Sequence, residues 1–596
     1  MKSVCHLLLC LLLCLLLGAS GCSVDPAAGE QRRFDQYVDQ RFVETLSRDY
    51  HTMALFLENP QDVGIRPEKV PATLGPRFSQ ESFRQAEETA KEQQARLQSF
   101  QRERLTPDQQ LTYDLMVRQN QLETAMSQER FDYLGSLFGS IGGLHLSLPA
   151  FFTEYPLRSE QDLKALIQTL EDVAPYLQSA LDYTQIQAQQ GLLMFSPEDV
   201  AQECRKTVSL GMDSSVLAEM ERKLEQLNLG EKEEEYKAQL EEAFSSSYLA
   251  GYRQVAEYME QLEPSGSIAG GLCQLKNGKE AYELMVQSAT GSSRSVEETQ
   301  ELMLEQLQRH TQGLYQLLAS SPQAYELLVQ EGLATHYTGY EEMLADLERL
   351  IQEDFPDIGQ LEYTVSPMSQ ETENDSVAAY FLFPAIDGTE AMSIKVNSSL
   401  DRSDLQTPQS FFTIAHEGLP GHMYQISYAY QTLSVPYRKV LASEFLGYSE
   451  GYATYVELLA YDYLKEAEPE LDPAALDLLR QLTLCQNDLA ALCDMGIHYQ
   501  GWGLEELNAF ALEQGWPLGD SSLLYQQLRD NPAVFLSYYV GYTEFALLKE
   551  AVQEELGEGF DPKAFHQAIL ENGPLPFELL EQRVKASLLQ ENQSVR

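Results

Sequence analysis

The sequence predicts a mainly α-helical fold. Long segments repeat apolar residues at helical spacing, and the clearest cover residues 161–181, 233–262 and 296–318. Short turns rich in Gly, Pro or Ser join such segments, as at residues 263–266. The strongest strand-like runs lie together in one short region before residue 400. These observations predict a large helical domain that carries a small β-hairpin or sheet.

The N-terminal residues have the pattern of a lipoprotein signal peptide. Lys2 precedes an apolar stretch over residues 7–17, which is too short to span a bilayer, and small residues then lead to Cys22. We therefore expect residues 1–21 to be cleaved and Cys22 to be lipidated. The lipid would anchor the exported protein to the outer face of the cell membrane. Ala19 stands where a lipobox usually has Leu, so ordinary cleavage and secretion are the alternative.

The mature chain has the length and composition of one large folded body. Because 43% of all 596 residues are hydrophobic and no clear linker is visible, we expect a tether at residues 22–32 and a single helical domain at residues 33–596. Two lobes flanking a cleft are an alternative arrangement of the same helices. The formal net charge of −50 argues against nucleic acid as a partner.

Cysteines are sparse in the mature chain. Those beyond the signal are too few for a disulfide scaffold, and a single bridge stays open. They are Cys204, Cys273, Cys485 and Cys493.

Two strand-like runs precede the most informative motif. Residues 379–383 and 392–397 flank a turn that contains Asp387 and Gly388, which is typical of a β-hairpin. An exposed edge strand in such a hairpin could align an extended peptide by main-chain hydrogen bonds. A hairpin that only covers the helices is the alternative.

The motif runs from His416 to His422 and reads His-Glu-Gly-Leu-Pro-Gly-His. Neutral imidazoles bind zinc, and Glu417 beside the first His can act as a general base toward a water molecule. Six residues separate the histidines, so a regular helix would place them about 9 Å apart along its axis. Pro420 and Gly421 favour a break between them. The alternative is a helix that ends at Pro-Gly with two incidental histidines.

The flanking residues place the motif on helices. Thr407 and Pro408 are typical of an N-cap and a first helical residue, and the apolar run that follows leads to His416. Glu450 is the best candidate for a third metal ligand, because its separation from His422 suits a second antiparallel helix. Glu457 lies seven residues further along the same face, too far to be a co-ligand, and could orient one instead.

At these residues the chain resembles the bacterial domain of unknown function family 885, which looks like a helical relative of the gluzincin peptidases. The family's His-Glu-x-x-Pro-Gly-His pattern stands at residues 416–422, with Met423 where a further His is usual. Its Glu-Gly-Trp-Ala-x-Tyr block matches residues 450–455, with Tyr452 in place of Trp. Its Asp-x-Gly-Ile-His block matches residues 494–498, although an expected upstream Arg is missing.

A fourth block, Tyr-x-x-Gly, matches the segment that begins at Tyr538. The resemblance implies a zincin-like catalytic domain with the small sheet next to the active-site helix. It implies zinc-dependent hydrolysis of peptide bonds in oligopeptides, with Tyr538 and His498 as hydrogen-bond donors to the reacting carbonyl. The implied metal ligands are His416, His422 and Glu450, and the implied base is Glu417.

Two other functions compete with this interpretation. A non-catalytic lipoprotein could retain the fold to bind peptides or cell-wall material. Residues 447–451 also fit the Gly-x-Ser-x-Gly nucleophile elbow of serine hydrolases. That elbow needs a buried strand before the Ser, whereas the surroundings of Ser449 look helical, so we do not favour it.

Overall fold

The computed structural model describes residues 26–262, 271–371, 373, 378–388, 391–397, 405–442 and 444–595. The expected signal peptide at residues 1–21 and the lipidation site Cys22 lie outside the described residues. The first described helix begins at Pro26, so the tether expected at residues 22–32 is helical over its second half.

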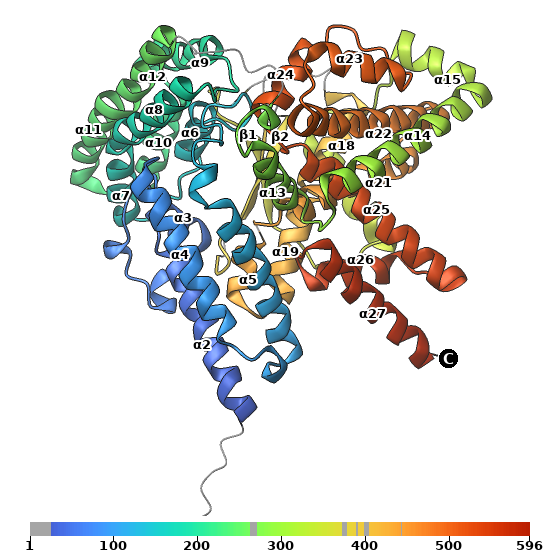
Figure 1. Ribbon diagram of the computed structural model, residues 1–596, viewed down its shortest axis with the longest axis horizontal. Helices are drawn as coiled ribbons and strands as arrows, with labels where there is room; N and C mark the ends of the chain where they lie inside the picture. The colour runs from blue at the N-terminus through green and yellow to red at the C-terminus, as the bar shows by residue number, and fades with distance from the viewer. Residues whose placement is uncertain are drawn as a thin grey trace, which may run out of the picture.

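The N-terminal part of the described chain consists of helices. Figure 1 shows the later ones, α7 to α12, at the upper left. Their apolar faces share one buried core that runs from Phe34 to Met259 and also takes in Tyr437, Val440 and Leu441 from a later helix. The helices are α2 (Pro26–Leu46), α3 (Tyr50–Phe56), α4 (Gln80–Gln98), α5 (Pro107–Met126), α6 (Leu144–Thr153), α7 (Glu160–Glu171), α8 (Val173–Gln190), α9 (Pro197–Leu210), α10 (Ser215–Gln226), α11 (Glu233–Ala243) and α12 (Leu249–Gln261).

The C-terminal part is also mostly helical and holds two further buried cores. Figure 1 shows α14, α22 and α23 at the upper right and α26 and α27 below them. The helices are α13 (Gly278–Thr290), α14 (Val296–Ser320), α15 (Pro322–Glu326), α16 (Tyr340–Leu350), α18 (Pro408–Glu417), α19 (His422–Thr432), α20 (Pro436–Leu441), α21 (Leu446–Ala467), α22 (Pro473–Met495), α23 (Leu504–Glu513), α24 (Ser522–Asp530), α25 (Leu536–Leu556), α26 (Pro562–Asn572) and α27 (Phe577–Val595).

Local sequence signals explain several helix boundaries. Ser295 and Glu298 form a capping box that starts α14 within the predicted segment 296–318. The predicted segment 161–181 is divided at Asp172, where α7 ends and α8 begins. The predicted mainly α fold is confirmed, although periodicity alone did not show where a long amphipathic segment breaks.

A three-stranded sheet lies between these two groups of helices in Figure 1. Its strands are β1 (Tyr363–Pro367), β2 (Ala379–Leu382) and β3 (Met392–Val396), in the order β1-β3-β2. The antiparallel pair β2 and β3, in which Phe381 lies opposite Ile394, confirms the predicted hairpin. Strand β1 pairs in parallel with β3 and was not predicted.

The two faces of the sheet contact different parts of the molecule. Phe381 and Ile394 are buried in the same core as Phe411 of α18, so the sheet packs beside the helix that carries the motif. On the other face, the Tyr380 hydroxyl donates a 3.3 Å hydrogen bond to Glu154, the C-cap residue that follows α6. The sheet therefore connects the N-terminal helices to the motif helix.

The four cysteines of the described chain are free thiols, and three of them are buried. The possible single disulfide is therefore not formed among the described residues. No described helix has the length and apolar character needed to cross a bilayer.

Candidate metal centre

The motif is split between two helices, as Pro420 and Gly421 predict. Helix α18 begins at Pro408 after the N-cap Thr407 and ends at Glu417, and α19 begins at His422. The Leu419–Pro420 peptide bond in the connection is cis. A Cβ atom on Gly421 would lie only 1.7 Å from the carbonyl oxygen of His416, so the tight turn requires Gly at this position.

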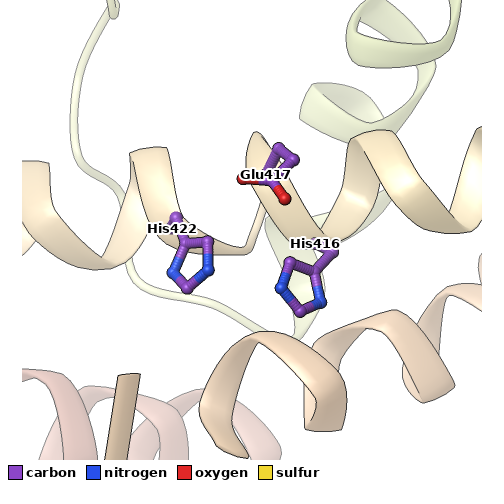
Figure 2. Close-up of side chains that lie close together, drawn as sticks. All are labelled: His416, Glu417 and His422. Carbon is purple, nitrogen blue, oxygen red and sulfur yellow. The ribbon is translucent and has the colours of Figure 1, made fainter. Parts of the chain in front are cut away.

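This break brings the two histidines together. Their ring centroids are 4.9 Å apart and the ring planes are inclined at 83°. Donor atoms of His416, Glu417 and His422, one from each, all lie within 4.8 Å of one another, and Figure 2 shows Glu417 above the space between the imidazoles. A regular helix through all seven residues would have separated the rings.

Glu450 reaches the same point from the N-terminal part of α21. Its Oε2 atom lies 3.5 Å from Nε2 of His416 and 3.3 Å from Nε2 of His422. Burial alone would raise the pKa of Glu450, but the charge and hydrogen bonds of the two histidines outweigh this effect and lower it. The carboxylate is therefore ionised and faces both imidazoles, as a metal ligand requires.

Glu457 contacts the ring nitrogen of His416 that does not face Glu450. Its Oε2 atom lies 3.1 Å from Nδ1 of His416, which directs Nε2 toward Glu450. Burial would lower the pKa of His416, but hydrogen bonds to Glu450 and Glu457 outweigh this and raise it well above its ordinary value. Carboxylates that orient a metal-binding imidazole in this way are common around metal sites.

The side chain of Glu417 is anchored to the edge of the sheet. The backbone N–H of Phe381 in β2 donates a 2.9 Å hydrogen bond to its Oε2 atom. Burial raises the pKa of Glu417, and the charges of His416 and His422 offset part of that rise. A carboxylate with a raised pKa is a stronger base than an exposed one.

Tyr538 lies beside this cluster, on the first turn of α25. Its ring is 6.2 Å from the ring of His416 and inclined to it by 18°. Burial and the nearby carboxylates of Glu450 and Glu417 raise the pKa of the phenol well above 10. The hydroxyl therefore keeps its proton at neutral pH and can donate it in a hydrogen bond.

Close packing of α21 against α25 sets this arrangement. A Cβ atom on Gly451 would lie 2.5 Å from backbone atoms of Gly541, and one on Gly541 would lie 2.4 Å from the carbonyl oxygen of Gly447. Glycines at these three positions let the two backbones approach each other, which brings Tyr538 next to the helix that carries Glu450.

His498 is not part of this cluster, contrary to expectation. It lies in a π-helical turn over Gly496–Gln500 and is fully buried. Its Nδ1 accepts a hydrogen bond from the N–H of Leu272, its Nε2 lies 2.9 Å from the carbonyl oxygen of Leu528, and its ring stacks on Tyr282. Both nitrogens are occupied by backbone groups. We therefore assign His498 a structural role and not the role of a hydrogen-bond donor to a substrate.

Residues that depart from the expected family pattern lie in the core. Met423 and Tyr452 are both fully buried in the cluster that surrounds α18 and α21, and Tyr452 packs against Tyr448 and Phe545. They therefore alter packing behind the metal ligands. Ser449 is also buried, within α21, and donates a hydrogen bond to Ala442, so residues 447–451 do not form a nucleophile elbow.

The side chains present fit a divalent metal ion. Two imidazoles and a carboxylate form the nitrogen and oxygen donor set that suits Zn²⁺. Glu457 already occupies Nδ1 of His416, which leaves Nε2 as the ligand atom. Nδ1 of His422 is buried and has no hydrogen-bond partner among the described residues. Glu417 lies beside these ligands, within reach of a water molecule or substrate.

A family model described as "Bacterial protein of unknown function (DUF885)" matches residues 61–584. The chain belongs to the DUF885 family. No curated protein matches it. This match confirms the family resemblance that was based on the four sequence blocks. The family description states no activity.

Solved structures support the fold. A "putative lipoprotein" of Colwellia psychrerythraea has a TM-score of 0.77 at 18% identity, with 94% of this chain and 99% of that chain covered. A "putative lipoprotein of unknown function" from Shewanella oneidensis has a TM-score of 0.60 at 15% identity, with the same coverage. A "putative oligoendopeptidase F" from Bacillus anthracis is less similar, with a TM-score of 0.35 at 11% identity and with 87% of this chain and 96% of that chain covered.

Two features of the site were not predicted. The first is the hydrogen bond from Phe381 to Glu417, which comes from a backbone N–H and therefore leaves no side-chain signal in the sequence. The second is which ligand Glu457 contacts: the sequence indicated that Glu457 could orient a ligand, and the structure places it at Nδ1 of His416. Its helical spacing from Glu450 did point to the correct face of α21.

Proposed function

We propose that this protein is a zinc-dependent peptidase that hydrolyses oligopeptides. The observation that carries the proposal is the meeting of His416, His422 and Glu450, from three helices, beside a carboxylate that belongs to the same motif. Glu417 is held in place by a backbone N–H of β2, which leaves its carboxylate available as a base.

A bound Zn²⁺ would supply a Lewis acid that polarises a peptide carbonyl and lowers the pKa of a water molecule. His416, His422 and Glu450 are the residues that would hold it. Glu417 takes a proton from the attacking water and returns it to the leaving amine, a role favoured by its raised pKa. One carboxylate thus both accepts the proton from water and delivers it to the leaving group.

Tyr538 acts on the oxygen atom of the reacting carbonyl. Its phenol keeps its proton and stacks near His416, so it can donate a hydrogen bond to the oxygen that becomes negative as water attacks. His498 has no part in this mechanism, because backbone groups occupy both ring nitrogens.

The sheet suits an extended peptide. Strand β2 is at the edge of the described sheet, and the N–H of Phe381 on its outer side contacts the proposed base. A peptide that pairs with this edge would lie beside Glu417, with its backbone fixed by main-chain hydrogen bonds and its side chains free to vary. Recognition of this kind is compatible with many oligopeptide sequences.

The proposed place of action is outside the cytoplasm. The N-terminal pattern that ends at Cys22 is that of an exported lipoprotein, and the solved structures from Colwellia psychrerythraea and Shewanella oneidensis are each described as a "putative lipoprotein". Peptides at the outer face of the membrane are the corresponding substrates.

Digestion of a mixed peptide library by the purified mature protein, read by mass spectrometry, tests the proposal. We expect cleavage that a chelator abolishes and added zinc restores, and that Glu417→Gln abolishes. Glu466→Gln is a matched control because Glu466 lies on α21 with 69% of its side chain exposed. Zinc-loaded protein that binds peptides without cleaving them would instead support the non-catalytic lipoprotein.

A further inference from the structure

A cavity lies apart from the metal centre. It has a volume of 490 Å³ and is lined by residues of α2, α4, α5, α13 and α20, together with the segment that precedes α21. None of the proposed ligands or catalytic residues lines it. The volume is within the range of small-molecule sites in proteins.

Charged groups of opposite sign face this cavity without pairing. Arg48, Glu123 and Glu444 all line it, yet the side chains of these three residues form no hydrogen bond or ion pair with any described residue. By contrast, Arg41 in the same wall is paired with Glu44 at 3.0 Å. All three residues are exposed, so their charged groups are accessible to a ligand that enters the cavity from solvent.

The three charged residues line the same cavity, and the charges of Arg48 and Glu123 both act on Glu444. Burial raises the pKa of Glu444, the charge of Arg48 offsets part of that rise, and the charge of Glu123 adds to it. Two carboxylates therefore repel each other beside a guanidinium that bonds to neither. A ligand with both a positive and a negative group would satisfy all three side chains.

Unsatisfied polar groups lie deeper in the same cavity wall. Tyr37 and Asn120 are only 5% and 4% exposed, and both line the cavity. The Tyr37 hydroxyl and Oδ1 of Asn120 have no hydrogen-bond partner among the described residues. Buried polar atoms without partners are rare, and they indicate a bound molecule or water that completes them.

Apolar side chains complete the cavity. Leu97, Met116 and Leu441 are each at least nine-tenths buried and belong to its lining. A ligand held here would bury an aliphatic group against them. The cavity thus combines charged side chains of both signs, buried polar atoms without partners and an apolar wall.

We propose that this cavity binds a small α-amino acid or short peptide as a zwitterion. Arg48 pairs with the carboxylate, because a guanidinium matches that group with two parallel hydrogen bonds. Glu123 and Glu444 pair with the ammonium group, and the apolar wall receives an aliphatic side chain. This site does not depend on the proposed peptidase activity.

Calorimetric titration of the full mature protein with L-leucine tests this site, with two blocked analogues as probes. N-acetyl-L-leucine lacks the ammonium group and L-leucinamide lacks the carboxylate. We expect L-leucine to bind at least about tenfold more tightly than either analogue. Equal binding of the three compounds, or no binding of L-leucine, would overturn the proposal.

Variants assign the two charges separately. Arg48→Gln should remove the preference for L-leucine over L-leucinamide, and the double variant Glu123→Gln with Glu444→Gln should remove the preference over N-acetyl-L-leucine. Arg32→Gln is the matched control, because Arg32 is exposed on α2 and does not line the cavity. Circular dichroism melting checks that each variant is folded.

The metal centre could also bind an amino acid, so His416→Ala is titrated in parallel. Binding of L-leucine that survives this variant and is lost in Arg48→Gln supports the second site. Binding that is lost in His416→Ala and unchanged in Arg48→Gln belongs to the metal centre, and would refute the second site.

Discussion

Glu417→Gln is the substitution that most sharply separates catalysis from structure. The two side chains have nearly the same shape, and a Gln side-chain oxygen can still accept the 2.9 Å hydrogen bond from Phe381. The proposed ligands His416, His422 and Glu450 are untouched. The variant therefore loses the ability to take up a proton and little else.

The expected loss follows from this role. General acid–base catalysis contributes on the order of 10² to 10⁴ in rate, so we expect kcat to fall by at least about a hundredfold, or roughly 2.7 kcal/mol in the activation barrier. Stability should not fall. Burial raises the pKa of Glu417, which means that the folded metal-free chain holds this carboxylate at a cost at neutral pH, and a neutral amide removes that cost.

Three measurements on purified Glu417→Gln and wild-type protein check this reasoning. They are peptide hydrolysis, zinc content and the melting temperature of the metal-free chains. We expect hydrolysis to be lost, zinc to be retained and the melting temperature to be equal or higher. Activity within about tenfold of wild type would refute the assignment of Glu417 as the base.

Three further predictions concern Tyr538, Glu457 and the buried Asp494. Tyr538→Phe removes the donor to the carbonyl oxygen and should lower kcat about a hundredfold with unchanged zinc content; unchanged kcat would contradict that role. Glu457→Gln weakens the hold on Nδ1 of His416 and should weaken zinc affinity about tenfold or more in a competition titration against a chelator, whereas equal affinity would count against it. Burial raises the pKa of Asp494 to about 7, so wild type should lose stability relative to Asp494→Asn as pH rises from about 4 to 7, by on the order of 4 kcal/mol in denaturant unfolding; a difference that does not vary with pH would refute this.

Much of the fold could be predicted from the sequence, because its signals are local. Helical periodicity predicted the amphipathic segments, and the pair β2 and β3 follows from two strand-like runs around an Asp-Gly turn. Strand β1 could not be predicted in this way. It is short, and it pairs with a strand that begins 25 residues after its own end, so its position depends on tertiary contacts.

The candidate site was also predictable in part. The spacing of His416 and His422, together with Pro420 and Gly421, indicated a broken helix, and the structure has that break. His498 was placed wrongly, because a sequence block does not show whether a histidine faces a cavity or bonds to the backbone. Its surroundings depend on Leu272 and Leu528, which are distant in the sequence.

Zinc stoichiometry of the folded mature protein tests the central claim most directly. After zinc is supplied and excess removed, we predict stoichiometric metal in wild type, in Glu466→Gln and in Glu417→Gln. We predict its loss in His422→Ala and in Glu450→Gln, with both variants still folded. Wild-type protein that is folded and holds no zinc, or zinc that persists in both ligand variants, would contradict the proposed metal centre.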